Sequence, residues 1–173
     1  MGRALMDSCL HPNEIDLISC HATATQVGNI SELSAIKTLF GSTNLIDKGL
    51  ENFFSEFYEK DFNNFSLEYD KLSKQEHNIN GKNRLKSLNI MATKTQIGHL
   101  LGAAGSVELL FALKCLEENI IIDNYNTKDP YDNSLTYMYN TKGSYSRKSL
   151  KNLIKNSFAF GGVNSSLVIS KLN

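Results

Sequence analysis

The sequence predicts an α/β fold, with a mixed sheet whose faces are covered by helices. Short apolar runs of strand length alternate along the chain with longer segments in which apolar residues recur every three or four positions. Strands that alternate with helices in this way build a sheet that the helices cover. The length of 173 residues suits one domain, 1–173, with a sizeable core.

The first part of the chain predicts a helix, a strand and a second helix. Residues 3–9 have the pattern of a helix end, and residues 14–19 have that of a short strand. A longer helix is predicted over 31–41, because Ser31 can cap its start and Gly41 can end it. Its apolar positions have helical spacing: Leu33, Ile36, Leu39 and Phe40.

The later part predicts a strand, a buried helix and a terminal pair of strands. The strand covers 88–92, and the long apolar segment 100–116 is predicted as the helix. The terminal strands cover 153–158 and 166–169, and the glycines between them favour a tight loop.

Residues 44–86 differ from the rest in composition. They are rich in Asn, Lys, Glu and Asp, which is typical of a solvated segment. Aromatic and apolar residues recur within them at spacings of three, four and seven, which predicts one amphipathic helix. We interpret 44–86 as an Asn/Lys-rich surface insertion within the domain.

Composition argues against several classes of function. The 18 basic and 18 acidic residues balance, so charge favours neither a nucleic acid nor an anionic membrane as partner. No apolar run approaches the roughly 20 residues that cross a bilayer, and the start of the chain lacks the pattern of a signal peptide. The three cysteines have no metal-site spacing and suggest reduced thiols. We therefore expect a soluble protein of a reducing compartment, either the cytoplasm or the matrix of a plastid or mitochondrion.

Three motifs stand at the ends of predicted strands. Residues 19–29 include His21, residues 92–105 include Lys94 and His99, and residues 156–164 include Phe160 before two glycines. The carboxyl ends of strands are where sheets of this class carry their ligands. A single histidine after a strand is usually structural, so the prediction of a site depends on these motifs occurring together.

Taken in this order, the motifs resemble the C-terminal half of the elongating β-ketoacyl-acyl-carrier-protein synthases, which have a thiolase-like fold. The resemblance covers nearly all of the chain outside 44–86. It implies an active site built from a cysteine nucleophile, two histidines and a lysine. His21, His99 and Lys94 match the histidines and the lysine, whereas the nucleophile of the family lies in a half that we do not find in this sequence.

The resemblance also implies roles for neighbouring residues. Glu108 matches the carboxylate partner of the lysine, and Phe160 matches the gate whose backbone N–H lines the oxyanion hole. Thr23 and Thr25 match the hydroxyls that hold the pantetheine arm of the carrier.

Two further expectations concern the surroundings of the histidines. We expect Lys94 to lie near His99 and to lower its pKa through like charge. Ala22 stands where the family usually has glycine, so we expect its φ to be negative.

The activity implied by the resemblance is a decarboxylating Claisen condensation between an acyl thioester and malonyl-acyl-carrier protein in fatty acid elongation. Each neutral imidazole would donate its Nε2–H to the thioester oxygen. No metal or organic cofactor is expected, because the pantetheine is carried by the acyl carrier protein. The expected partners are that carrier, the N-terminal half of the synthase and, in the complete enzyme, a second copy.

Several alternatives stay open. A polyketide-type condensing domain shares the motifs, and a non-catalytic remnant or dimer partner could keep the fold alone. The chain could also be a fragment of a full enzyme, which we prefer because it explains both the retained histidines and the absent nucleophile. Cys20 is a poor substitute nucleophile, since adjacent residues of an extended segment point to opposite sides and it adjoins His21.

Overall fold

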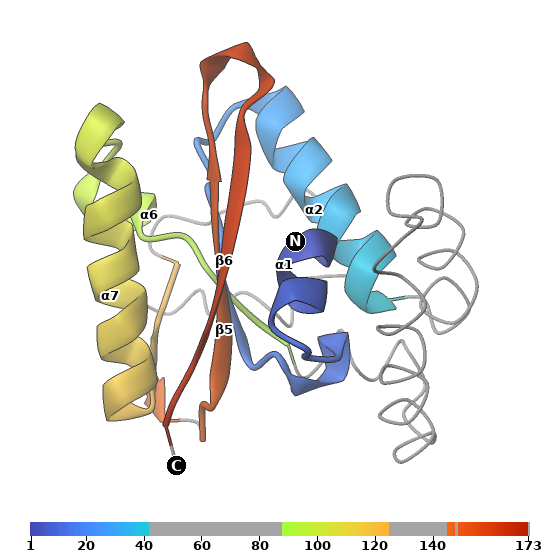
Figure 1. Cartoon of the computed structure of the whole chain (residues 1–173). Helices are drawn as coiled ribbons and strands as arrows, with labels where there is room; N and C mark the ends of the chain where they lie inside the picture. Colours follow the sequence, from blue (N-terminus) through green and yellow to red (C-terminus); the bar gives the residue numbers. More distant parts are fainter. Residues whose placement is uncertain (42–87, 125–144, 148, 173) are drawn as a thin grey trace, which may run out of the picture.

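The computed structural model describes residues 1–41, 88–124, 145–147 and 149–172 (Figure 1). The helices are α1 (Gly2–Asp7), α2 (Gln26–Gly41), α6 (Lys94–Ile97) and α7 (Ala104–Glu118), with single 3₁₀ turns at Pro12–Glu14, Leu101–Ala103 and Phe160–Gly162. The strands are β1 (Leu17–Ser19), β2 (Asn89–Met91), β3 (Ile120–Ile122), β4 (Tyr145–Arg147), β5 (Asn152–Phe158) and β6 (Asn164–Ser170).

The central sheet has the strand order β2-β1-β5-β6. Strands β2, β1 and β5 run parallel, and β6 pairs antiparallel with β5 to form a hairpin. Strands β3 and β4 form a separate antiparallel pair. The mixed sheet and its covering helices match the α/β fold that the sequence predicts.

Two hydrophobic clusters lie on opposite faces of this sheet, because neighbouring residues of a strand point to opposite sides. Ile18, Ile90 and Ile154 belong to the cluster under α1 and α2, together with Leu5, Ile36 and Phe40. The preceding or following strand residues belong to the cluster under α7: Leu17, Met91 and Leu153, with Ala112, Cys115 and Leu116. Figure 1 shows the resulting three layers, with α7 on one side of the sheet and α1 and α2 on the other.

The structure differs from the predicted elements at several ends. Helix α2 begins at Gln26, five residues before the predicted start at Ser31. Thr25 provides the cap, since its Oγ1 accepts a hydrogen bond from the backbone N–H of Gly28 at 3.3 Å. The predicted strand over 14–19 is shortened to Leu17–Ser19, because Glu14 ends a 3₁₀ turn that His11 caps.

The segment predicted as one helix over 100–116 is divided into a 3₁₀ turn and α7, which extends to Glu118. The sequence analysis missed α6 and the β3–β4 pair, which are too short to show a periodic pattern. The proposed insertion at 44–86 lies outside the described residues. Among the helices that the structure describes, none combines the length and the apolar character needed to cross a bilayer.

Candidate active site

The three motifs meet at one edge of the central sheet. Strands β1, β2 and β5 are parallel, so their carboxyl ends lie together. His21 follows β1, Lys94 follows β2, and Phe158 ends β5. The His21 ring contacts Phe158 edge-on, with 5.6 Å between ring centroids. This edge is where open α/β sheets bind ligands.

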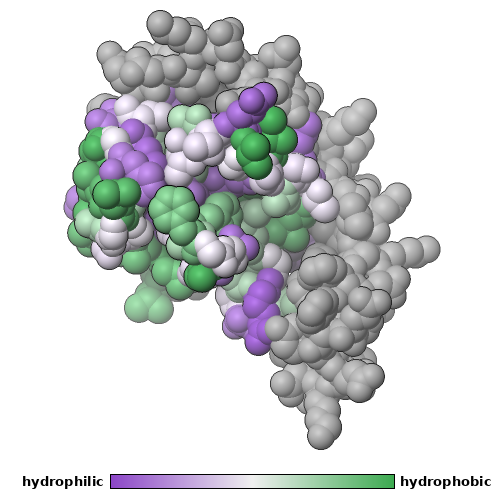
Figure 2. Space-filling view, turned by 90° about the horizontal axis from the view of Figure 1, so that it is seen from above, coloured by the Kyte–Doolittle hydropathy of each residue, from purple (hydrophilic) through white to green (hydrophobic). Residues whose placement is uncertain are grey.

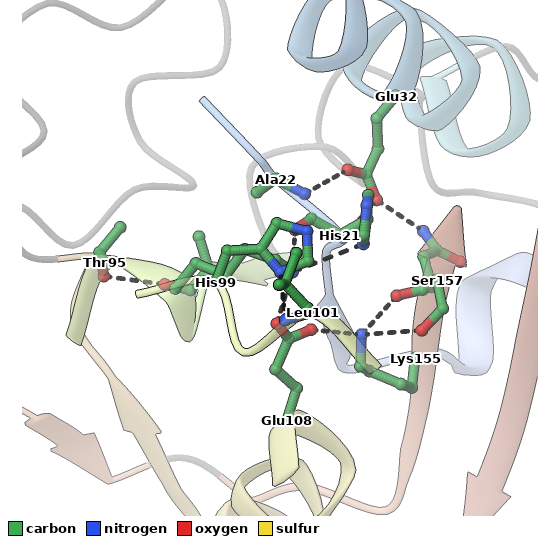
Figure 3. Close-up of polar contacts among 12 residues, drawn as sticks. His21, Ala22, Glu32, Thr95, His99, Leu101, Glu108, Lys155 and Ser157 are labelled. Atoms are coloured by element: carbon green, nitrogen blue, oxygen red, sulfur yellow. Dashed lines mark hydrogen bonds and ion pairs between the residues drawn. The ribbon is translucent and has the colours of Figure 1, made fainter. Parts of the chain in front are cut away.

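His21 and His99 form an edge-to-face pair. Their ring centroids are 5.7 Å apart and the ring planes are inclined at 88°. His99 lies on the exposed loop between α6 and the next 3₁₀ turn, where its Nδ1 accepts a hydrogen bond from the Leu101 backbone N–H at 3.1 Å (Figure 3). In the neutral ring this leaves the proton on Nε2.

Of the two histidines, His21 is the one that the Lys94 ammonium contacts in the structure. Its Nζ lies 3.4 Å from His21 Nδ1 and also donates to the His21 carbonyl oxygen. Burial and the charge of Lys94 lower the pKa of His21 below its ordinary value. The sequence predicts this electrostatic effect at His99. The structure shows it at His21, because Lys94 lies shortly after the end of β2, the strand paired with β1, and His21 lies shortly after the end of β1.

Glu108 pairs with two ammonium groups. One of its carboxylate oxygens accepts from Lys94, and the other accepts from Lys155 Nζ at 2.7 Å. All three side chains are buried, at 1% exposure for Glu108, 7% for Lys94 and 2% for Lys155. Burial lowers the pKa of Lys94, and its bond to Glu108 acts in the opposite direction.

A second buried carboxylate, Glu32, holds the backbone at His21 from the α2 side. Its two oxygens accept from the backbone N–H groups of His21 at 3.0 Å and Ala22 at 2.9 Å (Figure 3). Asn156 of β5 donates to the same carboxylate at 3.0 Å, and Ser166 of β6 donates to Asn156 at 2.8 Å. This chain of hydrogen bonds fixes the turn after β1 to the β5–β6 hairpin.

Thr23 and Thr25 lie in the turn between His21 and α2. Their hydroxyl oxygens are 3.2 Å apart, and Thr25 also caps α2. The contact between them is exposed, so both hydroxyls lie at the surface.

Phe160 lies in the loop between β5 and β6 and is 99% exposed. The glycines after it have φ of 81° and 79°, a conformation that residues with a Cβ rarely adopt. The Ala159 N–H donates to the Val163 carbonyl at 2.8 Å and closes the loop. Seen from above, the described surface has apolar side chains among polar ones (Figure 2). Phe160, Leu101 and Val27 are among the exposed apolar residues of the described part of the chain.

The family model of the β-ketoacyl synthase C-terminal domain matches residues 1–49 and 74–128. The chain belongs to this family. Its match includes His21, Lys94, His99 and Glu108. The fold and the resemblance predicted from the sequence are thereby confirmed.

Related synthases match nearly all of this family member but are much longer. The mitochondrial 3-oxoacyl-[acyl-carrier-protein] synthase of Arabidopsis thaliana is 30% identical over 99% of the chain and 29% of its own length. The 3-oxoacyl-[acyl-carrier-protein] synthase 1 of Escherichia coli K12 is 28% identical over 91% of the chain and 28% of its own length. The chain therefore spans less than a third of these relatives.

Solved structures have the same fold. A β-ketoacyl synthase from Burkholderia phymatum aligns with a TM-score of 0.64 at 22% identity, over 98% of the chain and 31% of that protein. The ishigamide ketosynthase/chain length factor aligns with a TM-score of 0.67 at 19% identity, over 98% of the chain and 31% of that protein.

The expectation for Ala22 was wrong. Its φ is 41°, and Ala24 is also left-handed at 61°. In this conformation the backbone N–H groups of His21 and Ala22 both donate to the Glu32 carboxylate. The left-handed conformation costs an alanine about 1–2 kcal/mol.

Cys20 is unsuited to act as a nucleophile. It is buried, at 4% exposure, and burial raises the pKa of its thiol well above the ordinary value, with Glu32 acting in the same direction. Within the described part of the chain, no cluster of three or more His, Cys, Asp or Glu side chains could hold a metal ion.

Sequence reasoning missed Glu32, Lys155 and Asn156. Glu32 and Lys155 carried a signal that could have been used, because each is a charged residue next to apolar positions. Glu32 shares a helix stripe with Ile36, and Lys155 directly follows two apolar strand residues. A charged side chain at such a position is buried and must have a partner.

Proposed function

We propose that this chain supplies the two histidines and the lysine of a condensing enzyme that joins an acyl thioester to malonyl-acyl-carrier protein with loss of carbon dioxide. The observation that carries the proposal is the pairing of His21 with His99. Each ring has its Nδ1 next to an N–H donor, from Lys94 or from Leu101, so each neutral ring keeps its proton on Nε2. Two such donors can stabilise one developing oxyanion.

The proposed reaction has two carbon–carbon steps. The bond between the malonyl carboxylate and Cα breaks, carbon dioxide leaves, and the electron pair moves into an enolate whose oxygen accepts from the Nε2–H groups of His21 and His99. The enolate carbon then attacks the acyl thioester carbon. The carbon–sulfur bond breaks, and the electron pair leaves on the cysteine sulfur as a thiolate. No proton is consumed, and the chemistry requires no metal or organic cofactor of the enzyme.

Lys94 supports this chemistry by holding His21 neutral. A protonated imidazole would lose its acceptor position at Nδ1, and the nearby ammonium opposes that protonation. Glu108 in turn holds the ammonium in place. In this proposal Phe160 borders the acyl thioester, and Thr23 and Thr25 bind the pantetheine arm at the entrance.

Acyl carrier protein is the proposed partner, and fatty acid elongation the proposed pathway. The curated relatives are named 3-oxoacyl-[acyl-carrier-protein] synthases, which supports both. One structural neighbour is described as a type II polyketide ketosynthase in complex with its acyl-carrier protein, which also supports a carrier as partner. A polyketide-type condensing domain is the second candidate, favoured by the fold likeness to this polyketide ketosynthase.

We further propose that the nucleophile comes from an N-terminal segment that covers the site edge, and that the complete enzyme is a homodimer. The exposed apolar residues at this edge support a covering segment, with Phe160 exposed at 99% and Leu101 at 74%. Alone, the chain should form no ketoacyl product, because condensation needs an acyl-cysteine. Segment 44–86 is proposed as an insertion outside this machinery, and residues 50–73 within it are not matched by the family model.

The test uses the complete enzyme and measures its half-reactions separately. His21→Ala and His99→Ala should each reduce malonyl decarboxylation by about 10²–10³, because each removes one oxyanion donor. Acyl transfer to the cysteine should persist at least in part. His11→Ala is the control, since His11 caps a distant 3₁₀ turn and should leave both half-reactions unchanged.

Unchanged decarboxylation in either site variant would show that the histidine concerned is structural. Product formation by the isolated chain, abolished by Cys20→Ala, would overturn the assignment of the nucleophile to another segment. Comparison of malonyl-carrier with carriers bearing polyketide intermediates separates the two candidate pathways.

A further inference from the structure

Lys155 is a fully partnered cation in the middle of a buried strand. It follows Leu153 and Ile154 in β5, both of which are fully buried, and its own side chain is 2% exposed. Its ammonium donates to Glu108 Oε2 at 2.7 Å, to Ser157 Oγ at 3.4 Å and to the Asn156 carbonyl oxygen. Three acceptors match the three N–H bonds of the ammonium. Such a complete set of partners indicates a specific position and not an accidental burial.

Lys155 also determines how Glu108 meets Lys94. Lys155 contacts Oε2 and Lys94 contacts Oε1, and the Lys94 ammonium is also in contact with Nδ1 of the His21 ring. The two lysines carry two positive charges against the one negative charge of Glu108. This side of the site therefore keeps an excess of positive charge facing His21.

We propose that Lys155 is a positioning residue for the His21–Lys94 pair, and that its buried ammonium fixes Glu108 and keeps the neutral form of His21 favoured. This inference rests on the proposed function of His21 as a neutral donor. It concerns a residue that does not touch the reacting atoms, so its effect must pass through Glu108 and through the electrostatic potential at His21.

Charged and titratable groups approach His21 from every element around it. Lys94 of α6 and Lys155 of β5 disfavour its protonation, and burial acts in the same direction. Glu32 of α2 and Glu108 of α7 favour protonation. The His99 ring also contacts the His21 ring edge-on, with 5.7 Å between the ring centroids. Without Lys155, two carboxylates would face one ammonium, and the balance at His21 would move toward the protonated ring.

The test is a titration of the histidines by nuclear magnetic resonance in the full 173-residue chain. Lys155→Met removes the charge and keeps an unbranched side chain, and the pKa of His21 should shift upward. Lys114→Met is the matched control, because Lys114 loses the same charge on α7 but is 61% exposed. Screening by water should leave the His21 pKa unchanged in the control. An equal pKa in Lys155→Met and the unsubstituted chain would overturn the proposal.

A second measurement needs no substitution and therefore holds if Lys155→Met fails to fold. In the unsubstituted chain, the Nζ of Lys155 should give the signal of a charged, slowly exchanging ammonium at neutral pH. A neutral amine at this position would contradict the proposal. Both measurements are independent of turnover. A shifted His21 pKa with decarboxylation unaffected by His21→Ala would therefore uphold Lys155 and refute the proposed function.

Discussion

Helices α2 and α7 lie on opposite faces of the sheet. Each has a row of buried side chains facing the sheet, and in both helices this row begins, next to the site, with a glutamate. In α2 the row runs from Glu32 to Ile36, Leu39 and Phe40, and in α7 it runs with the same spacing from Glu108 to Ala112, Cys115 and Leu116. Both glutamates are buried, at 4% and 1% exposure. Their positions are alike, but their partners differ.

Glu32 accepts hydrogen bonds from uncharged groups, two backbone N–H groups and the Asn156 amide. Glu108 accepts from two ammonium groups. The α2 carboxylate therefore fixes the backbone that carries His21, whereas the α7 carboxylate fixes the charges that act on its ring. A buried carboxylate can thus fix the backbone conformation or the position of charged side chains, depending on which hydrogen-bond donors the neighbouring elements place next to it.

The largest change in the free energy of unfolding is expected for the glutamate of α7. Glu108→Gln should lower the free energy of unfolding by about 3–5 kcal/mol, because it leaves two buried ammonium groups without a counter-charge. Urea denaturation of the chain measures this loss. Glu118→Gln on the same helix is the control and should change the stability little, since its side chain is 53% exposed. If Glu108→Gln and Glu118→Gln lost similar amounts of stability, the ion pairs of the buried Glu108 would contribute no more than those of an exposed glutamate, and the expectation would be wrong.

On the α2 side the loss should be smaller. Glu32→Gln keeps one accepting oxygen but turns an amide N–H toward a backbone donor, which should cost about 1–3 kcal/mol in unfolding free energy. Glu14→Gln is the matched control, because Glu14 also accepts from a backbone N–H, that of His11, but is exposed. If Glu32→Gln destabilised the chain more than Glu108→Gln, the hydrogen bonds of Glu32 would contribute more to stability than the ion pairs of Glu108, and the expected order of the two effects would be wrong.

The smallest effect concerns the turn that Glu32 holds. Ala22→Gly should raise the unfolding free energy by about 1 kcal/mol, because glycine adopts the φ of 41° without strain. The same substitution at Ala35, an exposed position inside α2, should lower it by about 1 kcal/mol. Thermal unfolding of the two variants compares the signs directly. Destabilisation by Ala22→Gly would show that the turn is not strained.

The sequence by itself determined the order of the main helices and strands, the pairing of terminal strands through a glycine loop, and the residues His21, Lys94, His99 and Glu108 as candidates. The elements follow from local periodicity, and the candidate residues follow from the resemblance of short motifs to those of the β-ketoacyl synthases; both depend on residues close together in the chain. The expectation for Ala22 considered that residue alone. In the structure its backbone N–H donates to Glu32, a residue ten positions away on the following helix.

Only the tertiary structure decided which groups meet. It paired Lys94 with His21, because the parallel register of β1 and β2 brings the ends of these strands together. It also brought Lys155 to Glu108 across 47 positions of sequence and Asn156 to Glu32 across 124. Contacts of this kind leave a polar residue in an apolar pattern as their only local sign. Their partners depend on sheet order and on which face each helix covers, and no periodicity within one element encodes either.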